Sequence, residues 1–387
     1  MANHARLFSA SGSKTWLSCA AAATAQLEYD NNSNVHADLG TLVHKVGDLC
    51  LASKDSRDAE HYIGKDLKKY FPDGLLVSTV FPADMAPPIQ SYIDYCRALQ
   101  TRDSVMMVEN RVSYRPWIAK EARGKKNEEG FGTADCLIVS DNILHCIDYK
   151  NGSGVHVDVK NNTQAMLYAL GVYNELSFLY DFDKITMHIV QPRKQNICEW
   201  TISVKALLRF GKAVTKRSRQ AVSKNPKFTP TPEGCQWCRK GMAGDCDALI
   251  AHTLAITSAL FDDMTNPDKR TLLDNKKLIL STIAAVEKNV IATLEAGDEF
   301  DGYKLVEGRT TRKWTEDAAD YLQENYDPDE IYLTKIIGVT LGDKLLSKEE
   351  MSQHTFKAQG SPVLAPESDR RKSIQTDVTD EFSDVTS

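Results

Sequence analysis

Two carboxylates and a lysine near the middle of the chain have the spacing of a hydrolytic metal site. Asp135 and Asp148 lie in two β-rich runs on either side of the dipeptide Asp141–Asn142. Because Asp and Asn tolerate the positive φ angles of a type I′ turn, this pattern predicts a two-residue β-hairpin. Counting along such a hairpin places Asp135 directly opposite Asp148, and Lys150 projects from the same face of the sheet.

The two facing carboxylates predict a bound cation. Like charges directly opposite each other destabilise a strand pair, so a cation is needed to compensate them. Oxygen-rich ligation suits Mg²⁺ or Mn²⁺ better than Zn²⁺. With a lysine beside it to stabilise negative charge, such a site is suited to phosphodiester hydrolysis. The alternative is an ordinary hairpin with solvated edge carboxylates, and the spacing alone leaves both interpretations open.

The segments around this hairpin indicate an α/β or α+β fold, with helices flanking a central, partly antiparallel sheet. Residue spacing and capping signals predict helices over residues 11–30, 38–51, 89–100, 161–178 and 204–227. Strand patterns occur over residues 104–114, 185–191 and 198–202. Gly40, His44 and Asp48 recur every four residues in the second helix, so they share one side of it.

The composition predicts a soluble globular protein. The chain has 387 residues, of which 42% are hydrophobic, and a formal net charge of -6. This length allows one sizeable core and an accessory module. No run approaches about 18 apolar residues and no export signal is apparent, so we expect no membrane span and a cytoplasmic location in a bacterial or phage-infected cell. The net charge excludes a uniformly basic surface but not a local basic groove.

Four short motifs resemble those of RecB-type nucleases in the PD-(D/E)XK superfamily, and they occur in the same order. The matching segments are Gly40–His44 (G-x-x-x-H), Gly132–Asp135 (G-x-x-D), Asp148–Lys150 (D/E-x-K) and Gln164–Tyr168 (Q-x-x-x-Y). The resemblance covers about residues 8–250 and implies a restriction-endonuclease-like core with a central mixed sheet. Asp148 stands where the family more often has glutamate, which shortens the reach of this carboxylate.

The resemblance implies a role for each motif residue. The implied ligands of Mg²⁺ or Mn²⁺ are His44, Asp135, Asp148 and the Tyr149 carbonyl. The implied catalytic residues are Asp135, Asp148, Lys150, Gln164 and Tyr168, the last two on one helix face beside the substrate. Glu109 on the preceding strand is a further candidate ligand, although a solvated strand residue is the simpler interpretation of this position.

A cysteine cluster follows the basic helix predicted over residues 204–227. Cys235, Cys238 and Cys246 form a C-x-x-C-x7-C pattern, and Cys19 is the best candidate for a fourth ligand. The arrangement resembles the iron–sulfur nuclease domains of AddB and of CRISPR-associated RecB-like nucleases. It implies a structural [4Fe–4S] cluster that ties the two ends of the nuclease domain together. The competing interpretation is Zn²⁺, with Cys19 or His252 as the fourth ligand.

The chain is expected to comprise a nuclease domain over residues 1–250, an accessory α+β module over 251–345 and a polar, partly disordered tail over 346–387. Its layout resembles a family of phage and prophage proteins that attach such a C-terminal segment to a RecB-like nuclease. The basic helix over 204–227 either steers DNA phosphates toward the site or is a solvated face.

These observations lead to one hypothesis of function. The chain is expected to be a metal-dependent DNA exonuclease, encoded by a phage, that resects DNA ends in recombination or repair and leaves a 5′-phosphate. The expected partners are DNA and a phage single-strand-binding or annealing protein. The alternatives are a non-catalytic iron–sulfur protein that binds DNA or acts as a scaffold, and a nuclease of CRISPR-adaptation type.

Overall fold

The computed structural model describes residues 5–30, 34–124, 129–140, 142–258 and 265–306, together with residues 323–324, 328, 347 and 349. The chain divides into two compact units, Met1–Val306 and Glu307–Ser387. All the expected catalytic residues and metal ligands belong to the first unit. The expected tail, and the part of the accessory module that follows residue 306, lie outside the described residues apart from those single positions.

A five-stranded mixed sheet forms the centre of the first unit. Its strands, in spatial order, are β1 (Val105–Ser113), β2 (Phe131–Ser140), β3 (Ile143–Tyr149), β4 (Lys184–Gln191) and β5 (Asn196–Ser203). Neighbouring strands are antiparallel except β3 and β4, which are parallel. Because parallel strands need a crossover connection, the helix α5 (Thr163–Leu176) joins these two. The expected mixed α/β architecture is confirmed.

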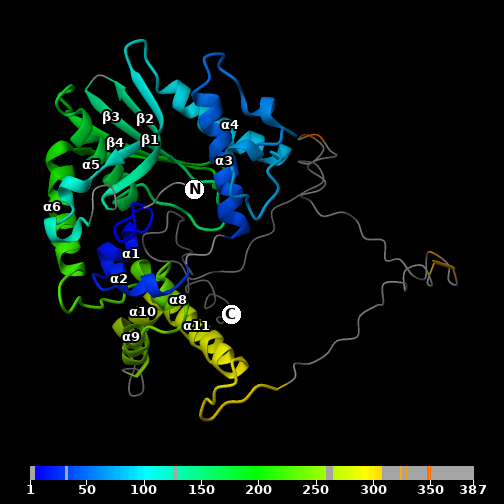
Figure 1. The fold of residues 1–387 in the computed structure, drawn as a ribbon, viewed down its shortest axis with the longest axis vertical. Coiled ribbons are helices and arrows are strands. Elements are labelled where there is room, and N and C mark those ends of the chain that lie inside the picture. The colour runs from blue at the N-terminus through cyan, green and yellow to red at the C-terminus, as the bar shows by residue number, and fades with distance from the viewer. Residues whose placement is uncertain are drawn as a thin grey trace, which may run out of the picture. The chain divides into compact units, whose positions relative to one another are not determined.

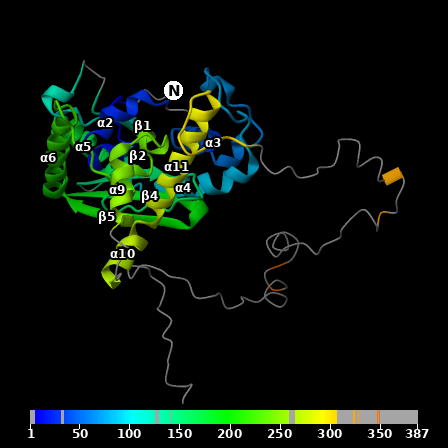
Figure 2. The same ribbon diagram turned by 90° about the horizontal axis from the view of Figure 1, so that it is seen from below.

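Helices cover both faces of the sheet and give three layers. One face carries α5 and α6 (Val204–Ala221), and the other carries α3 (Val35–Leu51) and α4 (Ala86–Ala98), as Figures 1 and 2 show. Side chains of β2 alternate between two cores: Leu137 packs with the α5 side, whereas Ile138 packs with the α3 side. Since this part of β2 is buried on both faces, the run Cys136–Val139 is continuously apolar.

The first predicted helix is divided in the structure. Instead of one helix over residues 11–30, the chain forms α1 (Ser13–Ser18), α2 (Ala22–Ala25) and a 3-10 turn at Gln26–Glu28. The backbone is extended at Cys19, and Ala21 donates its N–H to Lys227 O at 3.2 Å. The prediction of one continuous helix is wrong because these tertiary contacts outweigh the strong helix propensity of the alanine run.

The remaining predicted elements up to α6 form close to their expected bounds. The helix α3 begins at Val35 because the Asn34 side chain accepts hydrogen bonds from His36 N and Ala37 N. The helix α6 ends at Ala221 rather than at residue 227. Short 3-10 helices occur in the connections at Ala59–Tyr62, Lys68–Tyr70, Ala83–Met85, Arg115–Trp117, Lys120–Ala122 and Pro192–Lys194.

The helices after α6 belong to the same compact unit as the sheet. They are α7 (Pro232–Cys235), α8 (Arg239–Met242), α9 (Asp247–Ser258), α10 (Asn266–Asp274) and α11 (Lys276–Glu295). A capping box of Thr265 and Asp268 starts α10. The expected domain boundary at residue 250 therefore falls within α9, and α9 to α11 extend the first unit rather than starting another.

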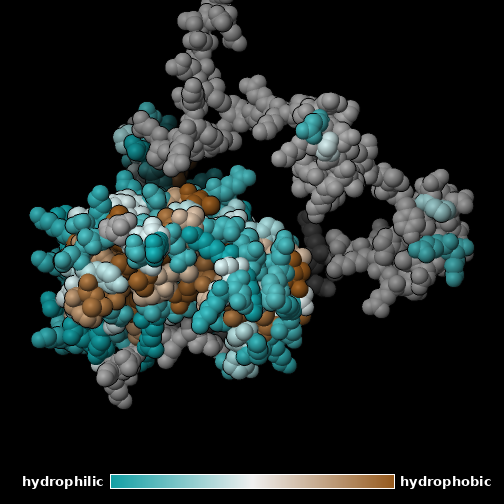
Figure 3. Space-filling view, turned by 90° about the horizontal axis from the view of Figure 1, so that it is seen from above, coloured by the Kyte–Doolittle hydropathy of each residue, from teal (hydrophilic) through white to brown (hydrophobic). Residues whose placement is uncertain are grey.

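The surface of the described residues mixes polar and apolar side chains. Figure 3 shows one face on which hydrophobic residues gather between hydrophilic ones. Exposed large apolar side chains include Phe178, Leu179 and Trp237. Within the described ranges, every helix is too short or too polar to cross a lipid bilayer.

Candidate metal and nucleic-acid site

The hairpin forms in the expected register. Ser140 pairs with Ile143, and the pairing continues to Cys136 and Ile147, one rung before the two carboxylates. Asn142 has φ of 61°, as the turn requires, while Asp141 lies outside the described residues. The strands then separate at the site, where Asp135 Oδ2 accepts a hydrogen bond of 2.8 Å from Tyr149 N. The turn thus brings Asp135 and Asp148 to the same end of the sheet.

Lys150 lies between a carboxylate and an amide. Its Nζ atom is 2.8 Å from Asp148 Oδ2 and donates a hydrogen bond of 3.2 Å to Gln164 Oε1. Gln164 Nε2 in turn donates to Tyr168 Oη at 3.0 Å. Because Gln164 and Tyr168 are one helical turn apart on α5, they share the face that points toward the hairpin. The structure therefore joins four of the five expected catalytic residues in one chain of polar contacts.

A glycine in β2 leaves room for this arrangement. A Cβ atom added to Gly132 would lie 2.7 Å from Tyr168 Cε1, which is closer than real Cβ contacts. The start of α5 is fixed by Asn162, whose side chain accepts a hydrogen bond of 3.1 Å from Ala165 N. The glycine of the G-x-x-D motif thus has a packing role, since it lets the α5 phenol approach the strand that carries Asp135.

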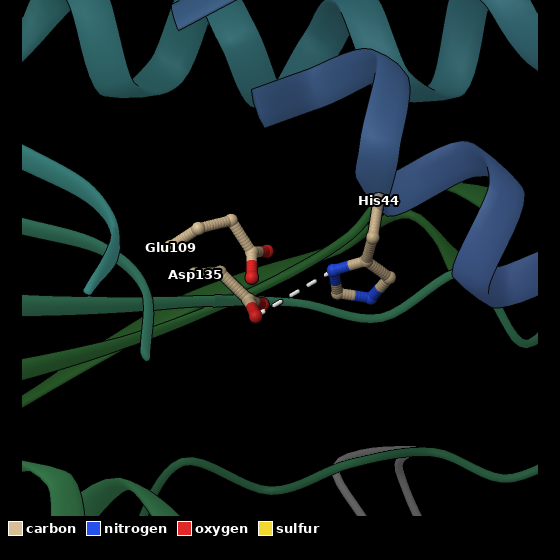
Figure 4. Close-up of side chains that lie close together, drawn as sticks. All are labelled: His44, Glu109 and Asp135. Carbon is tan, nitrogen blue, oxygen red and sulfur yellow. Dashed lines mark ion pairs between the residues drawn. The ribbon is translucent and has the colours of Figure 1, made fainter. Parts of the chain in front are cut away.

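His44, Glu109 and Asp135 converge on one point, as Figure 4 shows. One ligand atom from each side chain lies within 4.8 Å of the other two. His44 comes from α3, Glu109 from β1 and Asp135 from β2, and His44 Nδ1 is 3.5 Å from Asp135 Oδ1. The His44 ring also packs edge-on against Tyr149, with ring centroids 5.2 Å apart. This trio brings together two expected ligands and the additional candidate Glu109.

Glu109 reaches this position through an unusual backbone conformation. Its φ is 47°, in the left-handed region that side chains with a Cβ rarely occupy. The pairing of β1 with β2 passes from Val108–Cys136 to Asn110–Ala134 and leaves out Glu109 and Asp135. Strained backbone of this kind persists where the surrounding structure enforces it, frequently at functional sites. The simpler interpretation of Glu109 as an ordinary strand residue thus fails to describe its backbone.

The acidic residues of the site repel one another. Burial, followed by the Asp135 and Asp48 carboxylates, raises the pKa of Glu109 to about 7, although the residue as a whole is exposed. Burial and the nearby Asp135 also raise the pKa of Asp148, against the opposing effect of Lys150. The pKa of Lys150 is raised as well, because Asp148 and Asp135 together outweigh its desolvation. Lys150 therefore stays protonated near neutral pH.

These features fit a divalent cation. Asp148 Oδ2 is buried and accepts no well-aligned hydrogen bond from the described residues, although the Lys150 ammonium lies 2.8 Å from it. A buried acceptor without a hydrogen bond is costly, and a second positive charge would offset this cost. The donor set of carboxylates with one imidazole matches Mg²⁺ or Mn²⁺. His44, Glu109 and Asp135 are the nearest ligand set, with Asp148 and the Tyr149 carbonyl as the further donors expected from the sequence.

The four expected cysteines come together in the structure, although Cys19 lies more than two hundred residues from the other three in the sequence. Cys19, Cys235, Cys238 and Cys246 all line one small cavity between α2, α7, α8 and α9. Burial, and then the thiols of Cys238, Cys19 and Cys246, raise the pKa of Cys235 to about 11. Thr229 N donates to Cys19 Sγ at 3.4 Å, which holds the N-terminal ligand against the C-terminal ones. Cys19, rather than His252, is thus the fourth side chain at this cavity.

The long spacer before Cys246 is folded back by a glycine. Gly244 has φ of 73°, and a Cβ atom at this position would lie 2.3 Å from Ala285 O on α11. Only glycine allows this close approach in this conformation. The spacer therefore turns against α11 and returns Cys246 to the cavity that the other three cysteines line.

A comparison with protein families matches residues 4–372 to the DUF2800 model, described as a protein of unknown function. The chain belongs to the DUF2800 family. The match covers both the hairpin site and the cysteine cavity.

A cavity of about 470 Å³ in the DUF2800 chain extends from Lys150 and Gln164 to the loop that carries Trp237. Lys150 and Gln164 line it at the hairpin, and Trp237 and Arg239 line it at the cysteine loop. Sequence motifs did not predict this cavity, because its wall also uses the N-terminal segment before α1. The signal that was available in the sequence is Trp237, because a large aromatic residue between two cysteines is unexpected in a loop that contacts only solvent.

Proposed function

We propose that the chain is a divalent-metal-dependent DNA exonuclease. The observation that carries the proposal is the position of the Lys150 ammonium, between Asp148 and Gln164 and beside the trio of His44, Glu109 and Asp135. A protonated lysine next to a carboxylate metal site is the arrangement that phosphodiester hydrolysis needs. The exonuclease mode and the PD-(D/E)XK assignment rest on the resemblance of the four motifs to RecB-type nucleases.

The side chains have separate roles in this proposal. Bound Mg²⁺ or Mn²⁺ would polarise the phosphate and lower the pKa of the attacking water. His44, Glu109, Asp135, Asp148 and the Tyr149 carbonyl are the groups available to hold it. Lys150 stabilises the negative charge that develops on the phosphoryl oxygens. Asp148 keeps Lys150 protonated, and Gln164, itself held by Tyr168, fixes the direction in which the ammonium points.

We further propose that Cys19, Cys235, Cys238 and Cys246 bind a [4Fe–4S] cluster with a structural role. Support comes from their shared cavity and from the hydrogen bond of Thr229 N to Cys19 Sγ, which holds Cys19 beside the other three cysteines. The cluster would join α1 and α2 to the helices after α6, which lie more than two hundred residues away in the sequence. Structural Zn²⁺ is the alternative that metal analysis separates.

The proposed activity can be tested with end-labelled linear DNA and closed circular DNA, in Mg²⁺ or Mn²⁺. We expect wild-type protein to shorten the linear strands from an end and to leave the circles intact. Asp135→Asn should abolish the cleavage, whereas Glu121→Gln should not, because Glu121 pairs with Arg219 instead. Equal cleavage by wild type and Asp135→Asn would refute the assignment, and binding without cleavage would favour a non-catalytic DNA-binding protein.

A further inference from the structure

The cavity beside Lys150 extends to an aromatic side chain on the cysteine loop. Trp237 lies between α7 and α8, with Cys235 and Cys238 on either side of it in the sequence. Its side chain is 58% exposed, whereas Cys238 is 7% exposed. The cysteines thus point into the protein while the indole points outward to the cavity wall. An indole so exposed does not shield the cysteine site, so its surface is available to a ligand.

The charged side chains of the cavity wall are predominantly basic. Arg6, Lys14, Lys150 and Arg239 line it, and Glu233 is the one carboxylate among its described lining residues. Arg6 and Lys14 are exposed and lie at the N-terminal side, before and within α1. Such a wall attracts an anionic ligand that is long enough to reach from Trp237 to Lys150. It is a locally basic surface in a chain whose net charge is negative.

The volume of the cavity limits the form of this ligand. About 470 Å³ is within the range of about 300–1,000 Å³ typical of small-ligand sites, so it has room for one or two nucleotides but not for a duplex. Bases within a duplex already stack on each other and offer no free face at the side. An indole beside basic side chains is instead the usual platform for single-stranded nucleic acid.

We propose that Trp237 stacks on an unpaired base of a single-stranded DNA end, while Arg6 and Lys14 contact its phosphates and direct it to Lys150. This inference rests on the proposed nuclease function and specifies its substrate as a single strand. It also gives the cysteine loop a second role. A metal bound by Cys235 and Cys238 would hold Trp237, which lies between them in the sequence, in position for stacking.

The test is binding of a short labelled oligothymidylate, and of a blunt duplex of the same length, to the full-length protein without added Mg²⁺ or Mn²⁺. We expect Trp237→Ala to weaken binding of the single strand about 5- to 100-fold and to change duplex binding little. Trp237→Phe should retain most of the affinity. In wild type the oligonucleotide should quench tryptophan emission, and this quenching should disappear in Trp237→Phe although binding persists.

The controls separate stacking from a structural effect. Phe178→Ala removes another exposed aromatic ring, 78% exposed and not at the cavity, and should leave binding unchanged. The iron and zinc content of each variant reports whether the cysteine loop is intact; if Trp237→Ala loses metal, the quenching in wild type and Trp237→Phe decides the question. Unchanged affinity in Trp237→Ala, an equal loss for strand and duplex, or quenching that survives in Trp237→Phe would overturn the assignment.

The same measurements distinguish this inference from the nuclease proposal. Stacking by Trp237 in a protein that cuts no DNA in Mg²⁺ or Mn²⁺ would refute the nuclease while leaving the single-strand site in place. Metal-dependent cleavage together with unchanged binding by Trp237→Ala would refute the stacking role alone.

Discussion

The Lys150 ammonium and the Asp148 carboxylate form an ion pair, with Nζ 2.8 Å from Oδ2; the Asp148 side chain is buried, whereas that of Lys150 is 27% exposed. Asp148 Oδ2 accepts no well-aligned hydrogen bond from the described residues. A buried ion pair offsets its desolvation cost only when well-aligned hydrogen bonds satisfy the remaining lone pairs. A cation beside this oxygen, as proposed above, would supply the missing stabilisation.

Replacing Lys150 with methionine tests the role of the ammonium. We expect Lys150→Met to lower the rate of DNA cleavage about 10²- to 10³-fold, the usual effect of removing one group that stabilises developing negative charge. Affinity for Mn²⁺, measured by calorimetry, should be retained or increased, because a positive charge has left the site. A parallel loss of metal affinity and cleavage would show instead that Lys150 acts by holding the site together.

Replacing Glu109 with glutamine tests whether this residue is a metal ligand. We expect Glu109→Gln to weaken Mn²⁺ binding at least about ten-fold, because the number of charged ligands sets the affinity of such sites for hard cations. Glu287→Gln is the matched control, since Glu287 is an exposed glutamate on α11. Equal Mn²⁺ affinity in wild type and Glu109→Gln would leave the strained backbone at Glu109 without a metal-binding explanation.

The hairpin was predictable from the sequence, whereas the backbone conformation that brings the candidate ligand Glu109 to the site was not. A two-residue turn fixes the register, so the side chains opposite one another follow by counting from Asn142. Glu109 depends on a positive φ angle in a residue with no sequence signal for it. The β1–β2 pairing also has a gap at this position, which no residue pattern in the two strands signals.

The cysteine site shows the same difference between local pattern and tertiary contact. The C-x-x-C pattern predicted a metal site with Cys19 as the candidate fourth ligand, and the structure places Cys19 at the same cavity as the other three cysteines. The break in the first helix at Cys19 was missed, because it depends on contacts with Lys227 and Thr229, about two hundred residues further along the chain. The role of Gly244 was also hidden, since it depends on a close approach to Ala285 on α11.

A buried histidine outside the site should make the stability of the protein depend on pH. Burial, followed by the neighbouring His145, lowers the pKa of His188 to about 3. His188 is fully buried, and its ring faces His145, Tyr95 and Glu199. Between about pH 6.5 and pH 3 the unfolded chain binds a proton at this residue that the folded chain does not, so the free energy of unfolding falls as the pH falls.

The prediction is that the melting temperature of wild type decreases below about pH 6.5, and that His188→Gln shows a flatter decrease relative to its own value at pH 7. Thermal unfolding between pH 4 and pH 8 measures this difference. His36→Gln is the control, because His36 is exposed on α3. A steeper loss of stability on acidification in His188→Gln than in wild type would contradict the proposed cause.

Single cysteine replacements test the metal cluster without an activity assay. We expect Cys235→Ser to lose iron and sulfide and the brown colour of the anaerobically purified protein. Cys96→Ser should keep them, because Cys96 is buried in the core with α3 and α4, away from the four-cysteine cavity. Stoichiometric zinc without iron in wild type would replace the iron–sulfur proposal with a zinc site.

Gly234 controls how closely the two parts of the cysteine site approach each other. A Cβ atom at Gly234 would lie 2.5 Å from Ser18 Cβ, next to Cys19, and 2.8 Å from Thr231 Oγ1, which caps α7. Gly234→Ala must therefore separate α1 from α7. We expect it to lower the free energy of unfolding by about 1–3 kcal/mol and to reduce the metal content.

Gly40→Ala is the matched control for this last prediction. Gly40 lies within α3, and nothing lies within 4 Å of an added Cβ atom, so alanine there should be neutral or stabilise the helix by up to about 1 kcal/mol. Denaturant unfolding with metal analysis of both variants measures the two effects together. If Gly234→Ala keeps both its stability and its metal, the close contact between α1 and α7 is not required. The position of Cys19 beside the other three cysteines would then not depend on this contact.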